Sequence, residues 1–73
     1  MYYLIDRLIC DEWVTPLGHR KKEAIREAKG EWSSLSPFDK KRRTFFAVVK
    51  CEDDSEDTLY DKGYDTIEIF KEI

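Results

Sequence analysis

The 73-residue chain is poor in the residues that most often carry covalent or metal chemistry, with one histidine and two cysteines. His19 follows Pro16 and Gly18 in a loop-like segment, and no serine or cysteine stands at a spacing typical of a nucleophile and its base. A single histidine and the widely separated Cys10 and Cys51 do not form a zinc-ligand pattern. The sequence therefore predicts a protein that is not an enzyme and that holds no metal and no cofactor.

Long hydrophobic runs are also missing. No stretch approaches the roughly 20 apolar residues of a membrane span, and residues 1–7 lack the basic lead and apolar run of a signal peptide. Two cysteines fit reduced thiols better than a disulfide framework. Both end expected strands, so they could lie close together. These features predict a cytoplasmic protein that does not bind membranes.

What the chain has in abundance is charge, and the charge is unevenly distributed. Hydrophobic residues make up 41% of the sequence, enough for one folded domain over residues 1–73, and charged residues make up 40%. Residues 19–43 hold nine basic and four acidic side chains, whereas residues 52–65 hold seven acidic and one basic. This asymmetry favours electrostatic steering of a charged partner. The alternative is that the two segments lie side by side and neutralise each other.

The order of strand-forming and turn-forming residues predicts an α+β fold with the order β-α-β-β. Strands are expected at residues 2–10, 44–51 and 64–71, with a loop at 11–19 and an acidic loop at 52–62. The strands would form a three-stranded, mainly antiparallel sheet, with the last two joined as a hairpin. One long helix would pack on one face of this sheet, and a short helical turn would precede the second strand.

The long helix is expected over residues 20–35, because apolar side chains recur there with the helical period. These are Ala24, Ile25, Ala28, Trp32 and Leu35. Gly30 costs about 1 kcal/mol in a helix interior, but Trp32 and Leu35 stay in phase beyond it. The basic residues at 20–22 oppose the helix dipole, which indicates either a functional surface or an acidic segment folded over them.

The short helical turn is predicted from its first residues. Ser36 has the character of an N-cap, Pro37 suits the first helical position, and Asp39 places a carboxylate in the first turn. The turn would continue through the lysines and arginine of residues 40–42, whose charge the C-terminal end of a helix favours.

Apolar side chains occur on both faces of the expected strands, which a single helix cannot cover. The face away from the long helix is expected to carry four partner-binding side chains: Phe46, Val48, Tyr64 and Phe70. An exposed apolar face on a small domain is typical of a docking surface, either for a second copy of the chain or for a different protein. The alternative is that the short helix and the Trp13 loop cover this face.

The charged segments are expected to add contacts with the partner. The candidates are Arg20, Lys21, Lys22, Lys40, Lys41, Arg42, Arg43, Asp53, Asp54, Glu56 and Asp57. The acidic run is not predicted to bind calcium, because it has no glycine at the sharp turn that a calcium loop requires.

A second hypothesis is nucleic-acid binding by residues 40–43. These four cations precede Phe45 and Phe46, which offers charge for phosphates and rings for bases. The segment partly resembles the strand motif of RNA-recognition domains. However, Thr44 replaces the glycine of that motif and Ala47 replaces its central aromatic residue. Nucleic acid is therefore the less favoured partner.

A resemblance to a group of proteins rests on residues 21–28 (KKEAIREA), Glu31-Trp32, residues 35–37 (LSP) and residues 40–44 (KKRRT). In this pattern the chain resembles short phage and prophage accessory proteins. Some of these are inhibitors of host defence, such as anti-CRISPR-like proteins, which occlude the surface of an effector. The resemblance implies a small inhibitor or adaptor in the host-cell cytoplasm that binds a host or phage protein, nucleoprotein effectors included. It identifies no functional residues.

Overall fold

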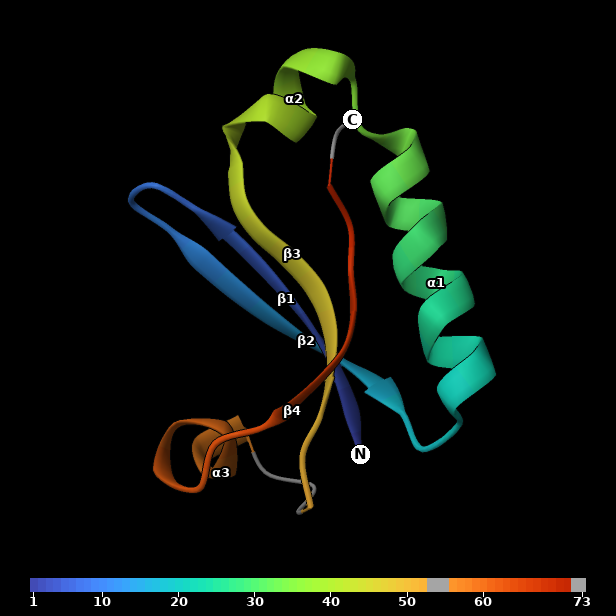
Figure 1. Ribbon diagram of the computed structural model, residues 1–73, viewed down its shortest axis with the longest axis vertical. Helices are drawn as coiled ribbons and strands as arrows, with labels where there is room; N and C mark the ends of the chain where they lie inside the picture. Colours follow the sequence, from blue (N-terminus) through green and yellow to red (C-terminus); the bar gives the residue numbers. More distant parts are fainter. Residues whose placement is uncertain (53–55, 72–73) are drawn as a thin grey trace.

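A computed structural model describes residues 1–52 and 56–71 (Figure 1). Its elements are β1 (Tyr2–Leu8), β2 (Glu12–Gly18), α1 (Lys21–Ser34), α2 (Pro37–Arg42), β3 (Arg43–Lys50), α3 (Glu56–Asp61) and β4 (Asp65–Ile69). The four strands form one antiparallel sheet in the order β2-β1-β3-β4. The α+β class and the pairing of the last two strands are confirmed, whereas the expected count of three strands is wrong.

The additional strand is β2, in the segment expected to be a loop. Trp13, Val14 and Thr15 are aromatic or β-branched, and they pair in antiparallel register with β1. Pro16 is tolerated because β2 lies at the edge of the sheet, where a missing amide donor disrupts no central pairing. Gly18, with φ at +92°, adopts the left-handed conformation that ends the strand.

The long helix α1 covers one face of the sheet, as its apolar period predicted. Ala24 and Ala28 are fully buried, and Ile25, Trp32 and Leu35 pack against the same cluster. The helix continues through Gly30, also as predicted. On the sheet side, this cluster consists of Tyr2, Leu4, Phe46 and Val48.

The prediction that Phe46 and Val48 face away from α1 is wrong. Phe46 is 2% exposed and Val48 is 0% exposed, both beneath the helix, and Phe70 packs against the same cluster. The small side chains of Ala24 and Ala28 let α1 approach the bulkier set of strand residues closely. Of the four predicted partner-binding residues, only Tyr64 is exposed in this structure.

The opposite face of the sheet is covered at one end by α3, in the segment expected to be an acidic loop. Leu59 on α3 is 3% exposed and completes a second buried cluster. Its other members are Tyr3, Ile5, Ala47, Val49 and Cys51. Trp13, which the alternative to an open docking face placed over this side of the sheet, is instead more than half exposed on β2. A single copy of the chain therefore shelters much of both faces.

A network of side-chain hydrogen bonds links α3 to the β1–β2 hairpin. The Arg7 guanidinium donates two hydrogen bonds to Glu12 Oε1, at 2.9 and 2.7 Å, and the Tyr60 hydroxyl donates to Glu12 Oε2 at 3.0 Å. The hydrogen bonds from Arg7 hold the pKa of Glu12 below its ordinary value, and the same bonds raise the pKa of Arg7.

The two cysteines lie far apart, against the expectation that they could be neighbours. Cys10 is exposed just beyond β1, and Cys51 is buried just beyond β3. Because β1 and β3 are antiparallel, with Tyr2 opposite Lys50, the two strands end at opposite edges of the molecule. Both thiols are free.

Candidate binding groove at the basic end

A groove lies where α2 leads into β3, beside the last residues of β4. Its volume is about 790 Å³, within the range of ligand-binding clefts. The lining residues are Trp32, Lys40, Lys41, Arg43, Thr44, Phe45, Phe46, Ile69, Phe70 and Lys71. The groove thus combines aromatic and aliphatic surface with four basic side chains, and none of these described lining residues is acidic.

Three aromatic rings form one wall of the groove. The ring centroids of Trp32 and Phe46 are 5.1 Å apart, and those of Phe46 and Phe70 are 5.9 Å apart in an edge-to-face arrangement. Trp32 and Phe70 are 6.3 Å apart. These rings come from α1, β3 and the residue after β4, so the wall forms only when the helix packs on the sheet.

Helix α2 positions the lysines of the groove. Ser36 Oγ accepts a hydrogen bond from the Asp39 amide at 3.1 Å, and Pro37 occupies the start of the helix, both as predicted. The basic residues 40–42 fall in the last turn, where the helix dipole favours positive charge. Lys40 Nζ lies 5.4 Å from the centroid of the Trp32 ring, a cation–π contact that holds this lysine at the groove.

Removing the Ser36 cap tests this local account. The variant Ser36→Ala should lose about 1 kcal/mol of unfolding free energy, because the first turn of α2 would lose its side-chain acceptor. Urea denaturation followed by circular dichroism measures the change. Ser33→Ala is the matched control, since Ser33 is exposed within α1. Equal midpoints for the two variants would contradict the capping role.

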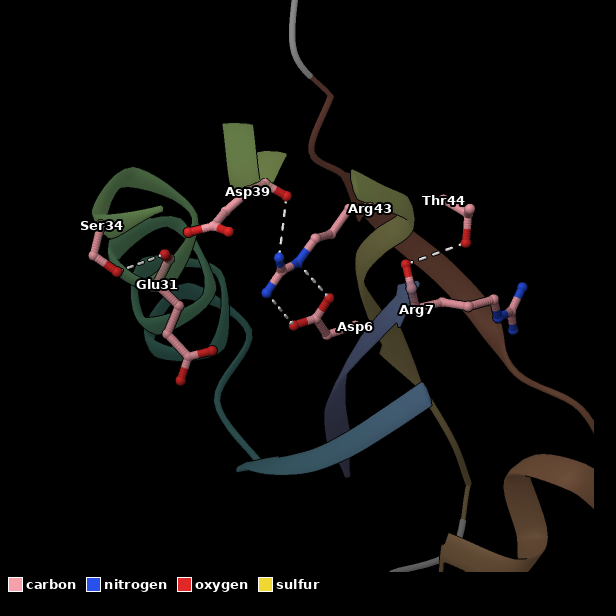
Figure 2. A network of polar contacts seen from close by, with 7 residues as sticks. All are labelled: Asp6, Arg7, Glu31, Ser34, Asp39, Arg43 and Thr44. Carbon is pink, nitrogen blue, oxygen red and sulfur yellow. Dashed lines mark hydrogen bonds and ion pairs between the residues drawn. The ribbon is translucent and has the colours of Figure 1, made fainter. Parts of the chain in front are cut away.

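Arg43 has a structural role that its place in a basic run does not suggest. Its Nε donates to Asp6 Oδ1 at 3.0 Å, its Nη2 donates to Asp6 Oδ2 at 3.4 Å, and its Nη1 donates to the Asp39 carbonyl at 3.0 Å. Figure 2 shows the guanidinium between these two aspartates, whereas the Arg7 guanidinium points away from the pair. The exposed fractions of the Arg43 and Asp6 side chains are 15% and 19%. Arg43 therefore ties α2 to β1 and contributes little net charge to the groove.

The other predicted charged residues do not gather at one site. Arg20, Lys21 and Lys22 are exposed at the start of α1, where Arg20 pairs with Glu23 at 3.3 Å. Arg42 lies over the exposed ring of Phe38 on α2, 5.8 Å from its centroid, and does not line the groove.

Among the acidic candidates, the one whose side chain the structure describes lies at the far end of the molecule from α2. Asp57 is exposed on α3, whereas Asp53, Asp54 and the side chain of Glu56 lie outside the described residues. Figure 1 shows α2 and α3 at opposite ends of β3. The alternative that the basic and acidic segments neutralise each other side by side is therefore wrong for these two helices.

The predicted sheet-face residues are divided between different environments. Phe46 and Phe70 line the groove, and Val48 is buried in the core. Tyr64 lies elsewhere, beside a smaller hollow of about 330 Å³ near Lys50 and Lys62. Two of the four predicted partner-binding residues, Phe46 and Phe70, thus lie at the candidate site. They form part of the wall of a basic groove and not an open apolar face.

Sequence reasoning missed Lys71 and Trp32 as site residues. A signal for Lys71 was present, because the start of one strand of an antiparallel hairpin meets the end of the other. Residues 40–42 precede β3, Arg43 begins it, and Lys71 follows β4, so their charges meet at the same end of the sheet. Trp32 gave no comparable signal, since its phase in α1 is that of an ordinary core residue.

Two further features of the described part of the chain bear on the site. Within residues 1–52 and 56–71, no three His, Cys, Asp or Glu side chains are grouped so that they could hold a metal ion. None of the helices in this part of the chain has both the length and the apolar character needed to cross a lipid bilayer.

Comparisons with known proteins add no relative. No protein-family model matches the chain, and no curated protein or solved structure is significantly similar to it. The geometry and charge of the groove are therefore the basis for a functional proposal.

Proposed function

We propose that this chain is a non-enzymatic binding protein whose basic groove takes a negatively charged segment of a partner protein. The observation that carries the proposal is the composition of the groove: Lys40, Lys41 and Lys71 stand around aromatic surface, and none of the residues that the structure describes along the groove is acidic. A segment with carboxylates and one or two large apolar side chains matches both features. The resemblance to phage proteins implies inhibition of a host protein. Inhibition would follow if the bound segment belongs to the surface with which that host protein performs its own function.

A protein segment fits the groove better than a nucleic acid for two reasons. The chain carries 16 acidic and 13 basic residues, so a long polyanion would meet repulsion outside the groove. Bases also need open ring faces for stacking. Phe46 is buried and Lys40 lies over the ring of Trp32, so neither ring offers such a face.

Nucleic-acid binding remains the second candidate, on one specific observation. Phe38 is 70% exposed on α2 beside Arg42, which places an open aromatic ring and a cation next to the groove lysines. Single-stranded DNA or RNA would use this pair together with Lys40 and Lys41.

Trp32 allows a direct test by fluorescence. A background variant Trp13→Phe leaves Trp32 as the single tryptophan, since the sequence has two. In this background, a short peptide of alternating glutamate and leucine is titrated and Trp32 emission is followed. The variant Lys40→Gln/Lys41→Gln should weaken peptide binding at least about tenfold, because two of the groove cations are removed.

The matched control is Lys21→Gln/Lys22→Gln, which removes the same charge from the exposed start of α1. It should change the dissociation constant by less than about twofold, given screening beyond a Debye length of about 8 Å. An equal loss of peptide affinity in both variants would show that the peptide binds by general charge attraction, and it would contradict the groove as the binding site. A parallel titration with oligo(dT) that binds more tightly than the peptide would favour the second candidate.

A further inference from the structure

The charge of the molecule is separated in space as well as in sequence. The basic helix α2 runs directly into β3, and the acidic helix α3 follows soon after its end. The eight residues of β3 span about 26 Å, at a rise of about 3.3 Å per residue. The Debye length at physiological salt is about 8 Å. Salt therefore screens the attraction between the two ends of one molecule, so their opposite charges do not neutralise each other there. Each end can instead attract the opposite end of another molecule.

The α3 end has the composition that the groove is suited to bind. Asp57, Asp61 and Asp65 are exposed there, and Tyr60 beside them is 67% exposed. Three carboxylates with an aromatic ring match a groove of three lysines with an aromatic wall. Leu59 and the hydrogen bond from Tyr60 to Glu12 hold α3 against the sheet, so the acidic end is presented as a fixed surface.

We infer that the α3 end of one copy of this chain docks into the basic groove of a second copy. The inference rests on the proposed function, because it uses the same groove, and it names a partner for it. The two surfaces are different and lie at opposite ends of the molecule, as Figure 1 shows for α2 and α3. The contact is therefore heterologous, and each copy keeps one unused surface on which a further copy can dock. A partner protein with an acidic segment competes with this self-association.

Sedimentation at two salt concentrations tests the inference on the full chain. At about 20 mM NaCl the average mass should rise with protein concentration above the 8.7 kDa of one chain, and at about 0.5 M NaCl it should fall back to that value. A mass that stays at one chain at low salt, up to about millimolar protein, overturns the inference.

Two neutral variants then identify the surfaces. Lys40→Gln/Lys41→Gln removes groove charge, and Asp57→Asn/Asp61→Asn removes charge from the α3 end. Each variant alone should remain a monomer. An equimolar mixture should form a complex that stops at two chains, because it contains one intact groove and one intact acidic end per pair. A mixture that stays monomeric, or single variants that associate like the wild type, overturns the inference.

Circular dichroism and urea midpoints confirm that both variants are folded, and Lys21→Gln/Lys22→Gln serves as a control that still associates. The two proposals fail separately. Loss of self-association with the glutamate–leucine peptide still bound in the groove overturns only the inference. Peptide binding that is indifferent to Lys40→Gln/Lys41→Gln overturns the proposed function itself.

Discussion

Replacing Phe46 with alanine is expected to lower the free energy of unfolding by about 3–5 kcal/mol. The ring is 2% exposed and contacts the rings of Trp32 and Phe70, so truncation leaves a cavity beneath α1 that backbone shifts can fill only in part. A domain of this length has a total stability of about 4–11 kcal/mol. Urea denaturation monitored by circular dichroism should therefore show a midpoint far below that of the unmodified chain, because the loss is a large fraction of the total stability.

Phe38→Ala is the matched control, since it removes the same ring from an exposed position. Its effect should stay within about 0.5 kcal/mol. Equal midpoints for the two variants would contradict the placement of Phe46 in the core. The comparison also shows why a charged substitution at Phe46 cannot test partner binding: Phe46→Asp would bury a carboxylate and unfold the domain.

Those parts of the fold that depend on local chemistry follow directly from the sequence. α1 could be predicted because Ala24, Ala28 and Trp32 repeat with the helical period and one face alone is apolar. α2 could be predicted because an N-cap serine, a proline and an aspartate act within four residues of one another. In both cases the residues that determine the structure are neighbours in the chain.

The strand β2 was missed because two loop-forming residues outweighed their strand-forming neighbours. Pro16 and Gly18 are typical of a loop, yet Trp13, Val14 and Thr15 favour a strand. Proline is excluded from central strands but not from edges. Whether a segment lies at an edge depends on the order of strands in the sheet, which local residues do not encode.

The two faces of the sheet illustrate a different limit. Alternation along β3 correctly separates Phe46 and Val48 from Ala47 and Val49. The same alternation is symmetric, so it does not say which set lies under α1. The outcome depends on shape, because the alanine side chains of α1 leave room for large side chains of the sheet. It also depends on Leu59, which packs α3 against the other face.

The candidate groove could be predicted in its charge but not in its form. The run of cations at residues 40–43 identifies a basic segment, but the sequence left open whether the acidic segment lies beside it or apart from it. Two things required the structure: Trp32 reaches the groove from another element, and Arg43 is occupied by Asp6, 37 positions earlier in the chain. Neighbouring cations in one run thus have different roles, because only Arg43 among the described contacts of this run forms an ion pair with a distant residue, Asp6.

Arg43 provides the second large effect. Arg43→Met keeps much of the side-chain volume but removes the ionic partner of Asp6 and the side-chain donor to the Asp39 carbonyl. Removing one member of a buried pair costs about 3–5 kcal/mol. Because this pair retains some exposure, we expect a loss of about 2–4 kcal/mol in urea denaturation. Arg42→Met, the neighbouring change at an exposed position, should stay within about 0.5 kcal/mol.

A double-mutant cycle separates the ion pair from the other contacts of Arg43. Asp6→Asn alone should also destabilise the fold, since the guanidinium would then be half-buried without a carboxylate. If the two side chains act on each other, Asp6→Asn/Arg43→Met should be more stable than the sum of the single losses by about 1–3 kcal/mol. Strict additivity would mean that Arg43 acts through the Asp39 carbonyl, in the first turn of α2, and not through Asp6. In that case the groove lysines would be positioned by the helix and not by its link to β1.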